Sequence, residues 1–266
     1  MERLRYSDIL RVLALVDVEL LRAAGREEGD VLGDANIGIG GVSGEYIEPD
    51  AKDPTATIIT FNQAGITLPE REYYLSADSK YVEIRAKYVD TLTKFFTLVE
   101  RKTAAADAKA VLALETELAK VRWTPEQSRD AIKTYNKMLL ADFPKQFPGF
   151  DWAAWAKAQG YEKRPEVVVA QPSYFKGVGA LAQRMPLDSW KAWLSARVIT
   201  AEARLLSKAF VDANFEFFGT VLNGQQAQRP RWKRGVSLVN GSLGEAVGKL
   251  YVDKYFPPES KARMQV

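Results

Sequence analysis

The strongest constraint on the fold of this chain is a spacing of three to four residues between apolar side chains, which recurs over long stretches. In residues 78–101 the apolar positions are Tyr81, Ile84, Tyr88, Leu92, Phe95 and Val99. Because 3.6 residues complete one helical turn, this spacing predicts a helix with one apolar face. Residues 104–122 repeat the pattern, so we expect a second helix packed antiparallel to the first after a short turn.

The helical pattern continues through most of the remaining chain. Residues 187–218 carry two apolar stripes, which predicts a long helix that is buried on more than one side and bent near Ser207. Residues 125–140 are predicted to form another helix. Thr124 is a suitable N-cap, a proline follows at the first helical position, and Gln127 completes a capping box.

Short β-prone segments interrupt the helices. GEYIEP and TATIITFN flank the turn-rich sequence DAKDP, which predicts a small β-hairpin near residues 45–62. Residues 166–170 (EVVVA) indicate a lone buried strand or an extended segment. The expected fold class is therefore mainly α, a multi-helix lobe with one small β-hairpin.

The first 44 residues differ from the rest of the chain. Residues 4–24 are amphipathic and predict an N-terminal helix, and residues 25–44 form a glycine-rich connector. No apolar run approaches the roughly 18 residues that cross a bilayer, so we expect no membrane span in this chain. No linker divides residues 45–266, which we therefore expect to form one helical unit.

Residues 229–256 predict a helix with an unusual composition. Its apolar stripe comprises Val236, Val239, Leu243, Val247 and Leu250. Gly241, Gly244 and Gly248 lie in the same helix, and each costs about 1 kcal/mol of helix stability relative to alanine. Two interpretations stay open: ordinary helix–helix packing, or a partner that approaches too closely for a Cβ atom.

A basic cluster surrounds Trp232 at the start of this predicted helix. It comprises Arg229, Arg231, Lys233 and Arg234. Three interpretations apply: a solvated or ion-paired face, a docking site for another domain, or a nucleic-acid contact. The net charge is only +3, from 37 basic and 34 acidic residues, so we expect no nucleic-acid binding. Basic residues at a helix N-terminus oppose the macrodipole, which favours an acidic partner from outside the helix.

The chain contains no histidine and no cysteine. This excludes Ser-His-Asp and Cys-His catalysis, the zinc motif H-E-x-x-H, and thiolate metal sites. Glu115 and Glu117 lie two positions apart on a predicted helix and do not share a face, so we expect both to be solvated charges. No catalytic, substrate-binding or metal-binding residue is assigned. We expect the chain alone to be inactive and to hold no cofactor.

Several segments together resemble one known family. In chain order they are PDAKDPT, LPEREYYL, KTYNKM, FPGFDW, VVVAQPSYF, SKAFVDANFEFFG, QRPRWKR and VNGSLGEAVGKLYV. In this order and spacing they are similar to the neprilysin and endothelin-converting-enzyme family of zinc metallopeptidases, over roughly residues 45–266. The resemblance implies the non-catalytic helical lobe that precedes the zinc domain and limits access of peptides to it.

The resemblance also implies partners. These are a C-terminal zinc domain, with zinc as the cofactor of the full-length enzyme, and peptide substrates in an extracytoplasmic location. The expected interdomain contact residues are Arg231, Lys233, Arg234, Gly241, Gly244 and Gly248. One alternative is a free-standing helical binding or scaffold protein derived from such a peptidase, without catalysis. Another is a histidine-free enzyme that uses carboxylates or lysine, for which no constellation of residues is found.

Overall fold

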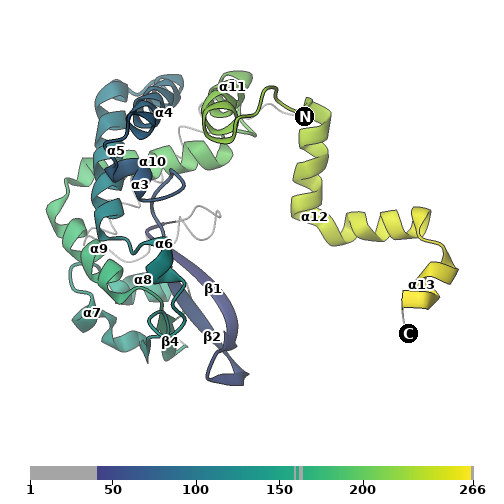
Figure 1. Cartoon of the computed structure of the whole chain (residues 1–266), viewed down its shortest axis with the longest axis horizontal. Coiled ribbons are helices and arrows are strands. Elements are labelled where there is room, and N and C mark those ends of the chain that lie inside the picture. Colours follow the sequence, from purple (N-terminus) through teal and green to yellow (C-terminus); the bar gives the residue numbers. More distant parts are fainter. Residues whose placement is uncertain (1–40, 159, 162–163, 265–266) are drawn as a thin grey trace. The chain divides into compact units, whose positions relative to one another are not determined.

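The computed structural model in Figure 1 describes residues 41–158, 160–161 and 164–264. The described part is mainly α-helical with one small sheet, which confirms the predicted fold class. The chain divides into two units, residues 1–218 and 219–266. The predicted helix at 4–24 and most of the glycine-rich connector lie outside the described residues. One helical unit over 45–266 stays a prediction.

Helices α4 (Ser79–Leu98) and α5 (Ala104–Val121) confirm the two predicted helices and form the centre of the first unit. Their facing side chains are fully buried, and include Tyr88, Leu92, Phe95, Val111, Leu114 and Leu118. Helix α5 also packs against α9 (Pro172–Arg184) and α10 (Leu187–Glu202). These three neighbours cover the apolar face of α5 and leave its opposite face at the surface.

The predicted bend near Ser207 is confirmed. Helix α10 ends at Glu202, and the chain becomes helical again in α11 (Lys208–Asn214). A π-helix, η2 (Phe215–Val221), follows directly. Two aromatic rings from this region stack on α4: Phe210 on Phe95 at 6.1 Å, and Phe217 on Tyr88 at 5.6 Å between ring centroids.

The sheet has four strands, in the order β1-β2-β4-β3. Strands β1 (Ser43–Asp50) and β2 (Asp53–Gln63) form the predicted antiparallel hairpin. Strand β4 (Glu166–Val169) pairs parallel to β2 and antiparallel to β3 (Lys137–Leu139). The prediction of a lone strand at 166–170 was therefore wrong, because the partners of β4 lie far away in sequence and leave no local signal.

The predicted helix at 125–140 was also wrong beyond its first turn. Helix α6 (Pro125–Ser128) begins with the expected capping box between Thr124 and Gln127. The Asp130 carboxylate then accepts hydrogen bonds from the backbone N–H groups of the two residues at 132 and 133, which forms a turn. The Asn136 amide donates to the Val169 carbonyl at 3.0 Å and draws the chain into the sheet. Tertiary hydrogen bonds here override helix propensity.

An aromatic core joins the sheet to the helices that cover it. Short helices η1 (Leu140–Asp142), α7 (Phe143–Gln146) and α8 (Trp152–Ala158) lead into it. Trp152 is 1% exposed, and its indole N–H donates to the Phe147 carbonyl at 2.6 Å. Phe61 of β2 lies 5.6 Å from Phe143 and 5.3 Å from Trp155 between ring centroids. The two tryptophans are core residues, as the sequence indicated.

The second unit contains α12 (Arg231–Tyr255) and α13 (Pro258–Met264). Helix α12 confirms the helix predicted at 229–256, and it has a kink at Leu243, where φ is −133° and ψ is 35°. None of its side chains is buried, so the second unit alone does not cover its apolar stripe. Within the described residues, no helix has the length and apolarity to cross a membrane.

Candidate functional site

Glu115 is the most deeply buried carboxylate of the described residues, with no exposed surface. It accepts hydrogen bonds from the hydroxyl groups of Thr67 at 2.6 Å, Tyr74 at 2.7 Å and Tyr88 at 3.0 Å. Burial raises the pKa of Glu115, while its hydroxyl partners and the Arg197 charge oppose that rise. The expectation of a solvated Glu115 was wrong, because its partners come from outside its own helix.

The segment LPEREYYL explains this burial. Tyr74 lies in the short helix α3 (Glu72–Leu75), and its hydroxyl accepts the backbone N–H of Leu68 at 2.7 Å while it donates to Glu115. Arg85 of α4 caps the end of α3 by donating to the carbonyls of Tyr73 at 2.8 Å and Ser76 at 2.9 Å. The cluster therefore fastens a loop to two helices, and its polar groups are already paired with one another.

A second buried carboxylate, Asp50, lies at the turn of the hairpin. It accepts hydrogen bonds from the Tyr135 hydroxyl at 2.7 Å, the backbone N–H of Lys52 at 2.9 Å and the Lys137 ammonium at 3.1 Å. The Tyr135 hydrogen bond, followed by that of Lys52, lowers the pKa of Asp50 to about 2. Lys137 also pairs with Glu166 at 3.0 Å. This cluster joins PDAKDPT to KTYNKM, so both segments stabilise the sheet.

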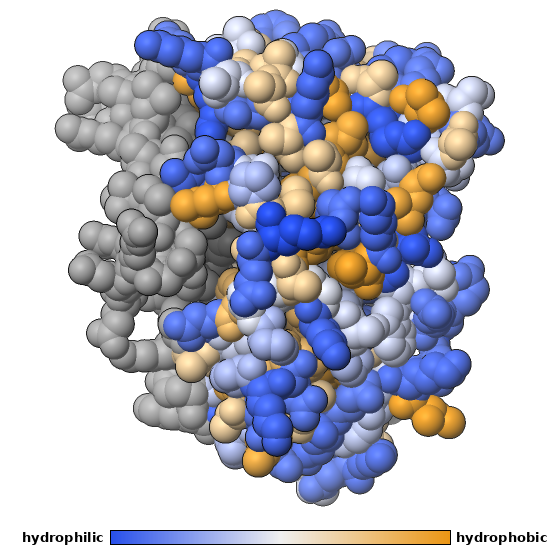
Figure 2. Space-filling model, turned by 90° about the vertical axis from the view of Figure 1, so that its left-hand side faces the viewer, coloured by the Kyte–Doolittle hydropathy of each residue, from blue (hydrophilic) through white to orange (hydrophobic). Residues whose placement is uncertain are grey.

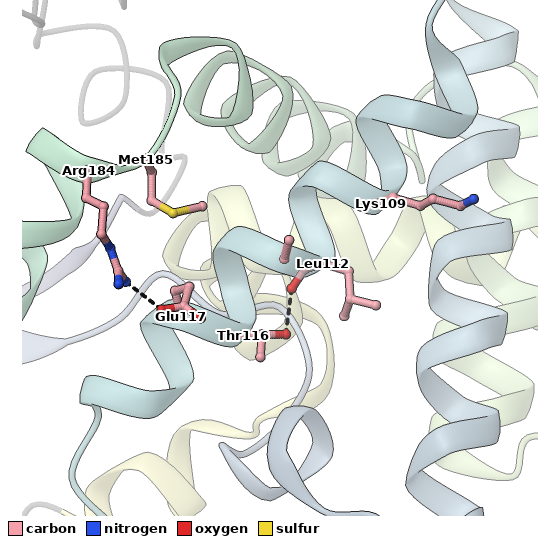
Figure 3. A pocket seen from close by; sticks show the side chains of 7 residues that line it. Lys109, Leu112, Thr116, Glu117, Arg184 and Met185 are labelled. Atoms are coloured by element: carbon pink, nitrogen blue, oxygen red, sulfur yellow. Dashed lines mark hydrogen bonds and ion pairs between the residues drawn. The ribbon is translucent and has the colours of Figure 1, made fainter.

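A surface groove of about 600 Å³ runs along the exposed side of α5 to the end of α9. Its lining residues are Lys109, Leu112, Ala113, Thr116, Glu117, Arg184 and Met185. At one end Arg184 reaches across to Glu117 at 2.5 Å, as Figure 3 shows. The sequence did not identify this groove, because it requires α5 and α9 to be neighbours.

Glu117 has a different role from the predicted solvated charge. It is partly buried and is held between Arg184 and Lys120, each at 2.5 Å. Hydrogen bonding to Lys120, and then to Arg184, keeps the pKa of Glu117 below its usual range. On the face drawn in Figure 2, apolar side chains form separate patches between hydrophilic ones.

The described residues do not fit a zinc site. Zinc in proteins is held mainly by histidine and cysteine with some carboxylates, and the sequence has neither histidine nor cysteine. Within the described ranges, no three acidic side chains are grouped closely enough to hold a metal ion. The two buried carboxylates are separated and are saturated with protein hydrogen-bond donors. No step of metal chemistry is therefore assigned to this chain.

The six expected interdomain contact residues all lie on α12. Arg231, Lys233 and the three glycines are exposed, and Arg234 is partly exposed. A Cβ atom built on Gly241, Gly244 or Gly248 meets no atom within 4 Å, so nothing in the described part of the chain requires these glycines. Among residues 219–264, no carboxylate forms an ion pair with any of the four basic residues around Trp232, although Arg229 donates to the Ser237 hydroxyl at 3.2 Å.

Comparison with known proteins gives the family. A sequence profile described as peptidase family M13 matches residues 3–266, almost the whole chain. The chain belongs to peptidase family M13. Neprilysin and endothelin-converting enzymes are among the relatives of this M13 chain, which confirms the resemblance found in its sequence segments.

Solved structures of M13 relatives share the fold. The zinc metalloprotease Zmp1 of Mycobacterium tuberculosis in its open state is 35% identical with a TM-score of 0.83, over 98% of this chain and 43% of that chain. A partial open state of that protease gives a TM-score of 0.72 at 32% identity, over 99% of this chain and 44% of that chain. PepO of Lactobacillus rhamnosis HN001, at 17% identity and a TM-score of 0.71, shares the fold alone, over 98% and 40%.

Curated M13 relatives are much longer than this chain. An endothelin-converting enzyme homolog of Locusta migratoria is 29% identical over 239 residues, which cover 84% of this chain and 32% of the relative. Mouse neprilysin is 27% identical over 236 residues, which cover 81% of this chain and 31% of the relative. The chain therefore spans about a third of the length of these curated relatives.

Proposed function

We propose that this chain is the substrate-gating helical lobe of a neprilysin-like zinc metalloendopeptidase. Residues outside the chain then bind the zinc ion and catalyse the hydrolysis of peptide bonds. One observation carries the proposal: the M13 match spans residues 3–266, yet the matched region is about a third of the curated relatives. The donor set agrees, because a chain without histidine or cysteine offers no usual zinc ligand set.

Helix α12 is the proposed contact with the zinc domain. Its apolar stripe runs along a helix in which no side chain is buried. The three glycines face open space. Each lowers helix stability by about 1 kcal/mol relative to alanine, and no contact within the described chain compensates for this loss. A partner that packs closely on Gly241, Gly244 and Gly248 explains this cost. The basic residues Arg231, Lys233 and Arg234 at its N-terminus favour an acidic surface on that partner.

Gating follows from the position of such a lobe. A lobe that faces a catalytic domain across an enclosed space admits short, flexible peptides and excludes folded proteins. The mycobacterial relative is known in an open and a partial open state, which supports movement of the corresponding part. We further infer that the enzyme works outside the cytoplasm, in the periplasm or at the cell surface. Recovery of the native protein only in cytoplasmic fractions would contradict that location.

A chimera tests the proposed function. Residues 1–266 replace the matching region of the mycobacterial zinc metalloprotease, and zinc content, circular dichroism and cleavage of a quenched fluorescent peptide are measured. We expect the chimera to bind zinc and to cleave the short peptide while it spares a folded protein. The chain alone should neither bind zinc nor cleave the peptide. A folded, zinc-loaded chimera without peptidase activity would contradict the proposal.

Variants of α12 within the chimera test the contact. Gly244→Leu places a bulky side chain at the proposed close approach, and Lys233→Glu reverses a charge at the helix start. We expect each to lower cleavage by about tenfold, because a misplaced lobe disturbs substrate positioning. Lys254→Glu at the other end of α12 is the matched control and should keep activity within about twofold. Equal activity of all three variants would favour the alternative, a free-standing helical binding or scaffold protein.

A further inference from the structure

We propose that the groove along α5 binds a short acidic peptide segment that carries large apolar side chains. All of its lining residues belong to the first unit. Its volume is about 600 Å³, and it is widely open to solvent. The proposal concerns a binding site separate from hydrolysis and does not depend on the proposed peptidase function.

The floor of the groove is apolar. Leu112 and Ala113 of α5 line it together with Met185, which follows the end of α9. The one hydroxyl in the lining, that of Thr116, donates to the Leu112 carbonyl at 2.7 Å within the helix and is not directed to a ligand (Figure 3). Methionine adapts its shape to different partners. The middle of the groove therefore accepts an apolar side chain and offers it no specific hydrogen bond.

The charges around the floor are mainly positive. Glu117 is neutralised by two cations, Lys120 and Arg184, which leaves one of their charges in excess. Lys109 lies at the far end of the lining, where its side chain extends away from Arg184 (Figure 3). No carboxylate of the described residues forms an ion pair with Lys109. This arrangement complements a ligand with negative groups at both ends and repels a basic one.

The spacing of these charges defines the length of the ligand. Lys109 and Glu117, the residue to which Arg184 and Lys120 bind, are separated by eight residues of α5, which corresponds to roughly 12 Å along the helix axis. An extended peptide advances about 3.3 Å per residue, so roughly four residues cover this distance. The best match is a peptide with two carboxylates four positions apart and apolar side chains between them.

Fluorescence anisotropy with a defined probe tests the proposal on the full chain. The probe is the fluorescein-labelled peptide Ser-Glu-Leu-Phe-Leu-Glu-Ser, and the matched peptides replace both glutamates by glutamine or by lysine. We expect saturable binding of the glutamate peptide that weakens as salt is raised. The glutamine peptide should bind about tenfold more weakly, and the lysine peptide should not bind.

Three variants locate the binding site. Ala113→Trp fills the groove from an exposed position, and Lys109→Glu reverses the charge at its far end; each should weaken binding about tenfold. Lys176→Glu, also exposed on α9 but outside the lining, is the control and should stay within about twofold of wild type. Circular dichroism verifies that the variants fold. Unchanged binding by Ala113→Trp, equal binding of the lysine peptide, or no saturable binding up to about 1 mM overturns the proposal.

Discussion

Glu115 is buried without contact to water, and its three hydroxyl donors explain why the protein tolerates this. An isolated buried carboxylate is strongly unfavourable, whereas hydrogen bonds from Thr67, Tyr74 and Tyr88 replace its lost hydration. Removal of the carboxylate would leave the hydroxyl groups of two fully or almost fully buried tyrosines without their acceptor. The stability of the helical core therefore depends on this one side chain.

We predict that Glu115→Ala lowers the free energy of unfolding by about 3 kcal/mol, because it opens a cavity and leaves buried hydroxyl groups unpaired. Urea denaturation followed by circular dichroism measures the change. Glu117→Ala, two residues along the same helix, is the control and should cost at most about 1 kcal/mol, since its ion pairs lie near the surface. A similar loss in both variants would refute the special role of Glu115.

The lowered pKa of Asp50 predicts how the stability of the fold depends on pH. Its pKa in the folded chain is about 2, below its ordinary value of 3.8. A carboxylate with a lowered pKa stabilises the fold above its unfolded value, and this stability is lost as pH falls from about 4 through 2. Asp50→Asn should therefore lower the Tm by a few degrees at pH 7, and the difference from wild type should shrink towards pH 2.

The control for this titration is Asp53→Asn in the same hairpin turn. In the part of the chain that the structure describes, Asp53 accepts hydrogen bonds from the backbone N–H and the hydroxyl of Thr55, an exposed residue two positions along the chain. We expect Asp53→Asn to change the Tm at pH 7 by less than Asp50→Asn does. If the difference between Asp50→Asn and wild type stays constant from pH 7 to pH 2, the hydrogen bonds of Tyr135 and Lys52 do not stabilise the charged form.

At the scale of elements, α9 and α12 differ in the surroundings of their glycines, which are tightly packed in α9 and open in α12. A Cβ atom on Gly179 of α9 would lie 2.0 Å from the Pro148 carbonyl oxygen, which is too close for any side chain. The neighbouring Gly149 has φ of 102°, a conformation that favours glycine. Backbone therefore lies directly against backbone where Gly179 of α9 meets Pro148. By contrast, the glycines of α12 touch nothing in the described chain.

We predict opposite effects of alanine at these two sites. Gly179→Ala should destabilise the chain by about 3 kcal/mol, because the backbone of the loop must move. Gly241→Ala should raise the helix stability of α12 by about 1 kcal/mol in the isolated chain, since its Cβ enters open space. Helical circular dichroism and thermal unfolding measure both. A loss of stability in Gly241→Ala would mean that another part of this chain already packs on that face.

The sequence predicted elements well where the signal is local. The apolar spacing of α4, α5 and α12, the capping box at Thr124 and the hairpin were all found from neighbouring residues. The errors arose where distant groups decide the structure. Asn136 leaves the helical pattern because it bonds to Val169, and Glu115 is buried by hydroxyl groups from two other segments. The groove was not predicted for the same reason, since no pattern within the sequence of α5 shows that α9 is its neighbour.

At the scale of the whole molecule, the two units differ in how much core they contain. Apart from Gly219, the buried residues that the structure describes lie in the first unit, and no described residue from 225 to 264 is buried. Removal of that segment therefore removes no core. It does remove the apolar stripe of α12, a helix in which no side chain is buried.

We predict that a chain ending at Gly224 keeps its Tm within about 3 °C of the full chain and binds less of a hydrophobic dye. A chain ending at Asn214 is the control, because it also loses Phe217, which is 1% exposed and stacks on Tyr88. Its Tm should fall by about 10 °C. Scanning calorimetry compares the three chains. A large fall on removal of residues 225–266 alone would show that α12 contributes to the stability of the first unit.

The parallel pairing of β2 with β4 also sets an order of events in time. Ile59 pairs with Val167, a separation of 167 − 59 = 108 residues. Contacts this distant along the chain form slowly, and a growing chain leaves the ribosome at about 5–20 residues per second. For several seconds of synthesis Phe61 therefore lacks the strand that completes its surroundings. We therefore expect chaperones to bind the nascent chain mainly during this interval.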